Sequence, residues 1–465
     1  DREFRQKLIA NRKSLCVTIV PAAMPKEKAE WNRVVERIAS VLEMTTNEIR
    51  KLMNKDKWDQ YSPKLLKEGV DYRTITRIAE NIDEFPGVYW DNRPIRVYTL
   101  TNTLAHILGY TGYISQEELK SASGKGYRPG ALIGKTGIEN VYDVDLRGEE
   151  GTLEREVNAL NQVTYQMIRK QPVHGRPLVL TIDSSMQKVA QAAMGKMRGA
   201  VIVTKPATGE VLAILSNPGY AANLFYKRLD VEEYRRIESD PDKPLFNRVI
   251  QAQYPASSTF KLITTIAGLE TGRLSARSSH FCDGGYMLGD RYFKCWFGRH
   301  GHQSLSDAIM NSCNVFFYRA GLDIGADTIL QYARMFGFGK KTGIDLVGEV
   351  SGFVPTREWK RKTAGRPWLD GDTLNLAIGQ GDLLVTPVQI NMMTCAIFNE
   401  GIAYQPYLKK EIRSLYNNHA IERNEGRHVL FTTDVSKSTF AAVKAGMIRV
   451  VQGGTGSAAF SPVVQ

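Results

Sequence analysis

The sequence has few cysteines, few histidines and no long apolar run. Five cysteines in 465 residues are too few for a disulfide scaffold, so an apolar core must stabilise the fold. No apolar run approaches the roughly 20 residues that a membrane-spanning helix needs. None of the seven histidines lies in a nucleophile-elbow context, and no glycine-rich phosphate loop opens a helix after a strand. These absences argue against a histidine-based triad and against a nucleotide-using enzyme.

Charge and length narrow the class further. The formal net charge is +12, but the 61 basic residues are dispersed among 49 acidic ones. Without a basic run or an aromatic platform, this pattern argues against nucleic acid and favours an anionic cell wall or membrane surface as partner. The composition is that of a globular protein, with 43% hydrophobic and 24% charged residues. A chain of this length exceeds the usual single core, so we expect two domains.

A serine and a lysine, Ser258 and Lys261, stand three residues apart at a predicted helix start. Apolar residues follow at helical spacing, and Gly272 stands where a left-handed helix stop belongs. On one helix face, a neutral lysine amine can accept the proton of a serine hydroxyl. Alone the motif is weak, because Ser-x-x-Lys arises by chance and an N-cap serine with a solvated lysine is the common structural alternative.

A second polar motif makes a chance occurrence of the first one less plausible. Ser312, Cys313 and Asn314 form a polar triplet between two apolar segments. An isolated Ser-x-Asn indicates an ordinary helix cap. Both motifs together, in this order and spacing, resemble the active-site serine transferases that react with penicillin.

The resemblance covers nearly the whole chain and is to class B penicillin-binding proteins of the cell-elongation type, the penicillin-binding protein 2 group. Residues 243–261 resemble the approach to the nucleophile in that group, and residues 198–216 resemble the first hairpin of its catalytic domain. Residues 134–157 are similar to its non-catalytic pedestal. Two later segments also match: 336–349 and 377–389.

This resemblance implies an α+β fold. A serine transpeptidase/β-lactamase-like domain, with an antiparallel sheet flanked by helices, would occupy residues 176–465. An elongated mixed α/β pedestal of the dimerisation type, with a head insertion, would precede it at residues 1–175. A segment with two prolines and a glycine, 171–177, would join the two. The other expected elements are a charged helix at 27–54, strands at 178–182, 200–204 and 210–216, a long helical middle at 258–400 and further strands near the end.

The implied activity is that of a peptidoglycan D,D-transpeptidase, which cross-links stem peptides through a serine acyl-enzyme and is a target of β-lactam antibiotics. Ser258 would be the nucleophile and Lys261 its base. Ser312 would relay a proton to the leaving amine, and Asn314 would hold Lys261 and the substrate amide. No cofactor is required for this chemistry. Substrate-binding residues implied by the family are Thr259, Gly379, Gln380 and Gly381.

The third motif of the family, a Lys-Thr-Gly strand beside the nucleophile, is not where it is expected. Lys-Thr-Gly occurs at 135–137, far before the nucleophile, and at 341–343, in a segment that is a loop between helices in the family. Gly454-Thr455-Gly456 lacks the lysine. In the family this glycine-rich loop comes shortly before the catalytic strand. We therefore expect the sequence to be truncated before that strand, and this chain alone to be catalytically crippled.

Cys282 and Cys295 flank a polar excursion that precedes the second motif. Three interpretations stay open: a disulfide, which an exported protein permits; a zinc site completed by His300 or His302; or two unpaired thiols. Some members of the resembled family place acidic, Cys and His groups here for zinc. A structural zinc ion is thus the one cofactor under consideration. The remaining cysteines are Cys313, either a further ligand or a small buried thiol, and Cys16 and Cys395, both expected in the core.

The resemblance also implies a location and partners. A family member begins with a short cytoplasmic tail and one membrane helix, so we expect an exported domain on the periplasmic side of the inner membrane, with its single N-terminal anchor absent from this sequence. The implied partners are peptidoglycan stem peptides, β-lactams as covalent inhibitors and the membrane glycan polymerase of the cell-elongation machinery.

Three other functions share some of these features. A serine β-lactamase shares Ser-x-x-Lys but is usually near half this length. A β-lactam sensor domain shares the motifs but lacks such a pedestal. A catalytically silent scaffold that activates a membrane glycan polymerase is the main non-enzyme alternative. Replacing Ser258 separates the scaffold from the enzyme, because only the enzyme needs the hydroxyl.

Overall fold

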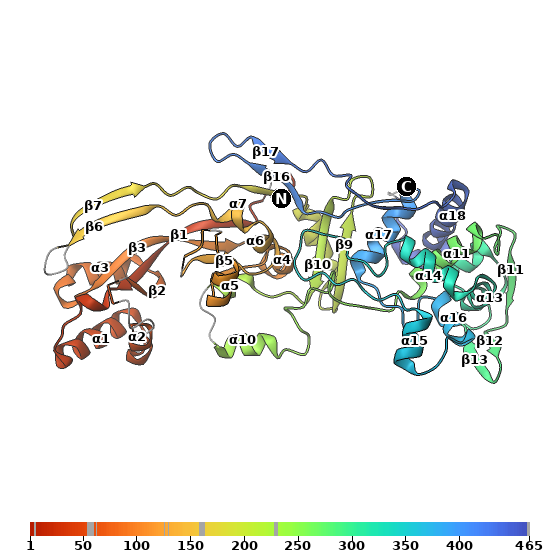
Figure 1. The fold of residues 1–465 in the computed structure, drawn as a ribbon, viewed down its shortest axis with the longest axis horizontal. Helices are drawn as coiled ribbons and strands as arrows, with labels where there is room; N and C mark the ends of the chain where they lie inside the picture. Colours follow the sequence, from red (N-terminus) through yellow and green to blue (C-terminus); the bar gives the residue numbers. More distant parts are fainter. Residues whose placement is uncertain are drawn as a thin grey trace. The chain divides into compact units, whose positions relative to one another are not determined.

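The computed structural model describes residues 1–3, 6–53, 60–61, 63–124, 126–128, 130–157, 163–226 and 231–462. These residues form two compact units (Figure 1). The small unit consists of Lys7–Thr99 and Val144–Gly175. The large unit consists of Asp1–Gln6, Leu100–Asp143 and Arg176–Gln465. No helix in the described part of the chain is long and apolar enough to cross a membrane.

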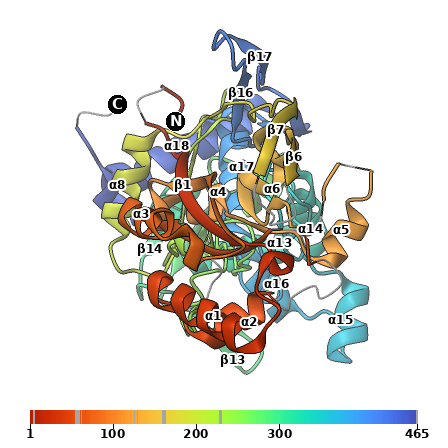
Figure 2. The same cartoon turned by 90° about the vertical axis from the view of Figure 1, so that its left-hand side faces the viewer.

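The small unit is built on an antiparallel sheet of order β2-β1-β3, with α1 and α2 on one face (Figures 1 and 2). The apolar residues of α1 recur at helical spacing and pack on the buried end of β1. The expected charged helix at 27–54 is two helices, because Glu43 takes a left-handed φ of 51° between them; residue 54 lies outside the described residues. The elements are β1 (Ile9–Ile19), η1 (Pro21–Ala23), α1 (Lys28–Leu42), α2 (Thr46–Met53), β2 (Lys64–Val70), α3 (Tyr72–Glu80), η2 (Ile82–Glu84), β3 (Val88–Tyr98), α7 (Asp143–Arg147), β6 (Thr152–Val157) and β7 (Val163–Lys170).

The large unit contains the antiparallel hairpin β9–β10 and a set of helices (Figure 1). Many of these helices pack around an apolar core formed by residues between Ala256 and Val443. Its elements are α4 (Thr101–Leu108), β4 (Thr111–Tyr113), α5 (Gln116–Ser121), β5 (Leu132–Gly134), α6 (Gly137–Val141), β8 (Leu178–Leu180), α8 (Ser184–Met194), β9 (Gly199–Thr204), β10 (Val211–Asn217), α9 (Ala222–Tyr226), α10 (Val231–Glu238), η3 (Ser257–Phe260), α11 (Lys261–Glu270), β11 (Ser279–Cys282), β12 (Gly285–Leu288), β13 (Arg291–Lys294), β14 (Gly301–Ser304), α12 (Leu305–Met310), α13 (Asn314–Ile324), α14 (Ala326–Met335), α15 (Arg357–Ala364), α16 (Asp370–Ala377), α17 (Pro387–Phe398), β15 (Ile402–Tyr404), β16 (Lys409–Arg413), β17 (Ala420–Arg423), β18 (Val429–Thr432), α18 (Lys437–Gly453) and η4 (Ser457–Ala459).

The predicted domain boundary between residues 175 and 176 stays a prediction. By their contacts, one unit boundary lies after Gly175, and residues 100–143 group with the large unit. The physical reason lies in α4, which rests on β10. The buried His106 donates from Nε2 to Pro244 O at 2.7 Å, and Tyr220 donates to Ala105 O at 3.0 Å. Buried polar groups paired in this way fix α4 to the large unit.

The predicted α+β class is confirmed, with one difference in the helical middle. Seven helices, α11 to α17, lie between residues 258 and 400 in the described chain, but four short strands interrupt them. These strands, β11 to β14, form two antiparallel hairpin pairings at 279–304. Glycines with positive φ, Gly284 and Gly289, supply the turns that a helix cannot contain. Both Lys-Thr-Gly copies lie outside strands, as expected for the copy at 341–343.

Candidate active site

The predicted serine and lysine lie at the start of one buried helix. Ser258 lies in the turn η3, and Lys261 is the first residue of α11. Ser257 takes a left-handed φ of 51°, which turns the chain into the helix. Ser258 is exposed, whereas Lys261 is only 2% exposed. A buried amine of this kind is stable only if its donors are satisfied.

The Lys261 amine is satisfied by neutral acceptors. Its Nζ donates to Ser312 O at 2.7 Å, to Ser312 Oγ at 2.9 Å and to Asn314 Oδ1 at 2.7 Å. No carboxylate pairs with it among the described residues. Burial therefore lowers the pKa of Lys261 to about 8, against a smaller opposing effect of the Cys295 and Cys313 thiols. With this pKa, roughly a tenth of the amine is neutral at pH 7, far more than for an ordinary lysine, and a base requires the neutral form.

Ser312 connects Ser258, the predicted nucleophile, to Lys261. The Ser312 hydroxyl donates to Ser258 Oγ at 2.8 Å and accepts from Lys261 Nζ at 2.9 Å. We expected Lys261 to take the proton of Ser258 directly. Among the described hydrogen bonds, the path from Ser258 to Lys261 runs through Ser312 instead.

Ser312 and Asn314 are placed by the break between α12 and α13. The helix α12 ends at Met310, and α13 begins at Asn314. Ser312 takes a left-handed φ of 52°, so its carbonyl and its hydroxyl both reach Lys261. Asn314 donates from its backbone N to Cys295 Sγ at 3.3 Å. The predicted interruption between two apolar helices is thus the feature that brings the second motif to the first.

The segment after α16 contacts the turn that carries Ser258. Ser257 N donates to Gly379 O at 2.8 Å. Gly379 has a φ of +72°, and a Cβ on it would lie 2.3 Å from Ser257 O and 2.6 Å from Phe260 Cβ. Only glycine permits this backbone approach. Gly379 therefore supports the nucleophile turn through its backbone.

Three thiols and one imidazole form a group that includes Cys313 of the second motif. The ligand atoms of Cys282, Cys295, His300 and Cys313 all lie within 4.8 Å of one another. His300 Nδ1 is 3.4 Å from Cys295 Sγ and 3.6 Å from Cys282 Sγ. All five cysteines of the chain are free and buried, so the disulfide interpretation is not observed. Four soft donors at this separation suit tetrahedral zinc.

Comparison with known families identifies the family to which the chain belongs. The penicillin binding protein transpeptidase domain matches residues 199–465, more than half of the chain. The chain belongs to the penicillin-binding proteins. The penicillin-binding protein dimerisation domain matches residues 2–180.

Individual relatives support the elongation type. The chain is 32% identical over 437 residues to the peptidoglycan D,D-transpeptidase MrdA of Acinetobacter baumannii, covering 93% of this chain and 64% of that protein. Penicillin-binding protein 2 from Helicobacter pylori, solved in complex with MreC, has a TM-score of 0.81 at 27% identity and covers 98% of this chain and 83% of its own. A chain of a peptidoglycan synthase complex that coordinates polymerization and crosslinking has a TM-score of 0.71 at 27% identity, over 99% of this chain and 77% of its own. The predicted resemblance to penicillin-binding protein 2 is confirmed.

The other predicted site residues differ in whether they lie near Ser258 or in the cysteine and histidine group. Thr259 is exposed and turns its hydroxyl back to Ala256 O at 2.5 Å. Gln380 and Gly381 are exposed beside Gly379, where a substrate can reach them. His302 is not part of the cysteine and histidine group, because its ring lies edge-on to Phe281 at 5.0 Å and its side chain is exposed. Cys313 takes the fourth place.

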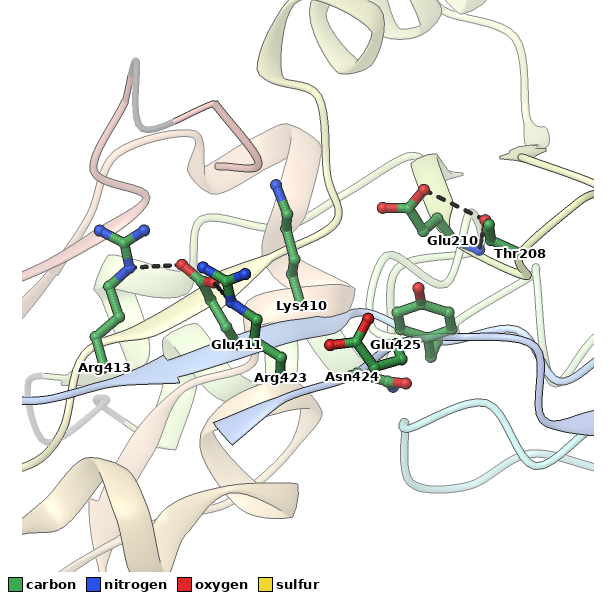
Figure 3. A pocket seen from close by; sticks show the side chains of 9 residues that line it. Thr208, Glu210, Lys410, Glu411, Arg413, Arg423, Asn424 and Glu425 are labelled. Atoms are coloured by element: carbon green, nitrogen blue, oxygen red, sulfur yellow. Dashed lines mark hydrogen bonds and ion pairs between the residues drawn. The ribbon is translucent and has the colours of Figure 1, made fainter. Parts of the chain in front are cut away.

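A pocket in the large unit is separate from this site. Its volume is about 360 Å³, and its nine lining residues include none of the serine and lysine motifs (Figure 3). Three of the charged residues that line it pair with one another, since Glu411 contacts Arg413 at 2.5 Å and Arg423 at 3.2 Å. It contains none of the predicted site residues, and the predicted serine and lysine motifs meet at Ser258 instead.

Proposed function

We propose that the protein is a serine-type peptidoglycan D,D-transpeptidase of the cell-elongation machinery. The observation that carries this proposal is the hydrogen-bonded path from Ser258 through Ser312 to the buried Lys261, with Asn314 as the third acceptor of the amine. An exposed hydroxyl joined to a desolvated amine is the arrangement that activates a serine nucleophile. Family membership and the MrdA relative supply the substrate class.

The acylation step begins when Ser258 Oγ attacks the carbonyl carbon between the last two D-alanines of a stem peptide. The serine proton passes to Ser312 Oγ, whose own proton passes to neutral Lys261. The tetrahedral oxyanion is stabilised by backbone N–H groups, one of them that of Ser258 at the helix start; each such donor is worth roughly 3 to 4 kcal/mol in related chemistry. The C–N bond then breaks, and Ser312 delivers a proton to the departing D-alanine amine. The products are an acyl-enzyme ester and free D-alanine.

The deacylation step uses the same groups in reverse. The amine of a second stem peptide attacks the ester carbonyl and gives its proton through Ser312 to Lys261. The ester C–O bond breaks, Ser258 regains a proton, and a new amide cross-link forms. A β-lactam enters by the same route, because its strained amide presents a similar carbonyl to Ser258, and it remains as a slowly hydrolysed ester.

A silent scaffold is the competing function, and cells distinguish it from the enzyme. In the source bacterium, a full-length copy with Ser258→Ala as the sole copy is expected to lose elongation although it is made at normal level. A normal cell length with that variant would support the scaffold and contradict the enzyme.

We place the working protein at the periplasmic face of the inner membrane, beside a glycan polymerase and an MreC-like partner, as the two solved relatives suggest.

The pH dependence of acylation follows from Lys261. Below its pKa of about 8 the amine is protonated and cannot accept a proton, and above it the amine is neutral. We expect the limiting acylation rate of the full-length protein by a β-lactam to rise with pH, with half of its maximum near that pKa. Stopped-flow measurement across this interval checks it, and a rate that falls or stays flat as pH rises contradicts the role of the amine.

We also propose that the cysteine and histidine group holds one structural zinc ion. The donor set of Cys282, Cys295, Cys313 and His300 has the number and softness of ligands that structural zinc sites use. Zinc would tie the two hairpins at 279–304 to the segment that carries Ser312 and Asn314. Metal analysis of the full-length protein should find one zinc per chain, with a clearly lower unfolding temperature after chelation.

Variants make the zinc test specific. Cys282→Ser should lose zinc and lower the unfolding temperature, since a four-ligand site is broken. Cys16→Ser is the matched control, because Cys16 is also buried and free but lies in the small unit. Equal zinc content in both variants would contradict the site.

A further inference from the structure

A buried lysine outside both motifs holds the segment that supports the nucleophile. Lys360 lies on α15 and is 6% exposed, although it carries an ammonium group. Its Nζ contacts Asp382 Oδ2 at 2.5 Å and Asp372 Oδ1 at 3.2 Å. A cation buried to this degree is retained in proteins only with such pairing. Its two partners lie on either side of the helix end that leads to Gly379.

The two aspartates differ in what else holds them. Asp372, in the first turn of α16, also receives a bidentate pair from Arg366 at 2.6 and 2.8 Å and the backbone N–H of Leu369 at 3.0 Å. Asp382 has Lys360 as its partner among the described ion pairs. Lys360 therefore links the start of α16, which several contacts hold, to Asp382, which has fewer contacts.

Asp382 lies in an excursion that runs beside the nucleophile turn. The excursion is held at one end by Gly379 O, which accepts from Ser257 N at 2.8 Å. It is held at the other end by the pair of backbone hydrogen bonds between Tyr254 and Val385, at 2.9 and 2.8 Å. Between these ends, Gln380 and Gly381 are exposed, and Asp382 is the residue whose side chain ties the excursion to another helix.

We propose that Lys360 is a positioning residue for acylation, which acts through Asp382 to hold the Gly379–Asp382 excursion against Ser257 and so keeps Ser258 in register with Ser312. This inference rests on the proposed transpeptidase function. The contact that transmits it is Gly379 to Ser257, where the backbones approach so closely that a Cβ would not fit. A small displacement of the excursion moves the turn that carries Ser258, and reaction rates are sensitive to such shifts.

The test separates the bond-forming step from binding. In the full-length protein, Lys360→Met keeps the apolar stem of the side chain and removes its charge. Asp372 still has Arg366 as an ion-pair partner. Asp382 is partly exposed, so water can hydrate its carboxylate. We expect the limiting acylation rate with a labelled penicillin to fall at least about tenfold, with little change in the concentration at half-maximal rate. Adduct amplitude at long times should stay at one per chain, which shows that the variant is folded.

Two further variants make the test specific. Asp382→Asn should slow acylation to a similar degree, and the double variant should be no slower than either single one, because both remove the same contact. Arg357→Met is the matched control, since it removes another α15 ion pair, with Asp327 at 2.9 Å, that does not reach the excursion. A Lys360→Met rate within twofold of wild type, or additive effects of Lys360→Met and Asp382→Asn, would overturn the role of Lys360. A wild-type protein that forms no adduct would overturn the proposed function itself.

Discussion

The Ser258→Ala variant of the full-length protein is expected to form no covalent adduct with a labelled penicillin, whereas the wild type forms one per chain. The ester bond requires the Ser258 hydroxyl, which is exposed and hydrogen-bonded to Ser312 at 2.8 Å. No other described serine lies in this path to a buried lysine. Intact-protein mass spectrometry measures the adduct directly. The fold should be retained, because the change removes one exposed hydroxyl.

The chain supplies a matched control for this variant. Ser185 and Lys188 form a second Ser-x-x-Lys at the start of α8, and Ser185 is exposed. Ser185→Ala should leave the adduct unchanged, because its lysine is solvent-exposed and no second motif faces it. An adduct on Ser258→Ala, or its loss in Ser185→Ala, would show that the nucleophile is misassigned.

The Lys261→Met variant should slow acylation by about 10²- to 10⁴-fold, the range that general bases contribute. The methionine keeps most of the buried stem but cannot accept a proton. Lys261→Arg is the sharper variant, because a guanidinium stays protonated at all accessible pH values. If Lys261 acts as a base, both variants fail equally. If only its positive charge mattered, arginine would restore much of the rate.

A control for Lys261 comes from the second Lys-Thr-Gly copy. Lys341 is exposed in the loop between α14 and α15, outside any strand. Lys341→Met should acylate at the wild-type rate, and thermal unfolding of each variant should show a single folded population. Stopped-flow acylation with a reporter β-lactam gives all the rates. A Lys261→Met rate within tenfold of wild type would contradict the general-base role.

The sequence could predict the two motifs because local spacing determines them. Ser258 and Lys261 stand at the start of a run with helical apolar periodicity, and Ser312 and Asn314 stand at a polar break between two apolar segments. The β9–β10 hairpin was predictable for the same reason, since two apolar runs flank a Pro and Gly turn. In each case the signal lies within about one turn or one hairpin of chain.

Features that depend on distant contacts were not predictable. The hydrogen-bonded path from Ser258 through Ser312 to Lys261 depends on a left-handed φ at Ser312, which a serine rarely adopts and sequence spacing does not reveal. Cys313 joins Cys282 and Cys295 because the α12–α13 break turns toward two hairpins, and its sequence context equally suits a buried thiol.

The sequence around Lys360 did not indicate that this lysine is buried. It stands among Arg357, Arg361 and Lys362, a pattern typical of a solvated basic helix. Its burial beside Asp372 and Asp382 depends on contacts between distant parts of the chain. Likewise, the grouping of residues 100–143 with the large unit depends on contacts of α4 with β10, more than a hundred residues later in the chain.

The most direct measurement of the central claim is D-alanine release by the full-length protein. The protein is supplied with uncross-linked glycan strands bearing pentapeptide stems, together with the proposed polymerase partner. We expect D-alanine to appear in equal amount to new cross-links, and both to be absent with Ser258→Ala. Cross-links that form equally with Ser258→Ala, or the absence of both products from a wild type that penicillin acylates, would contradict the account.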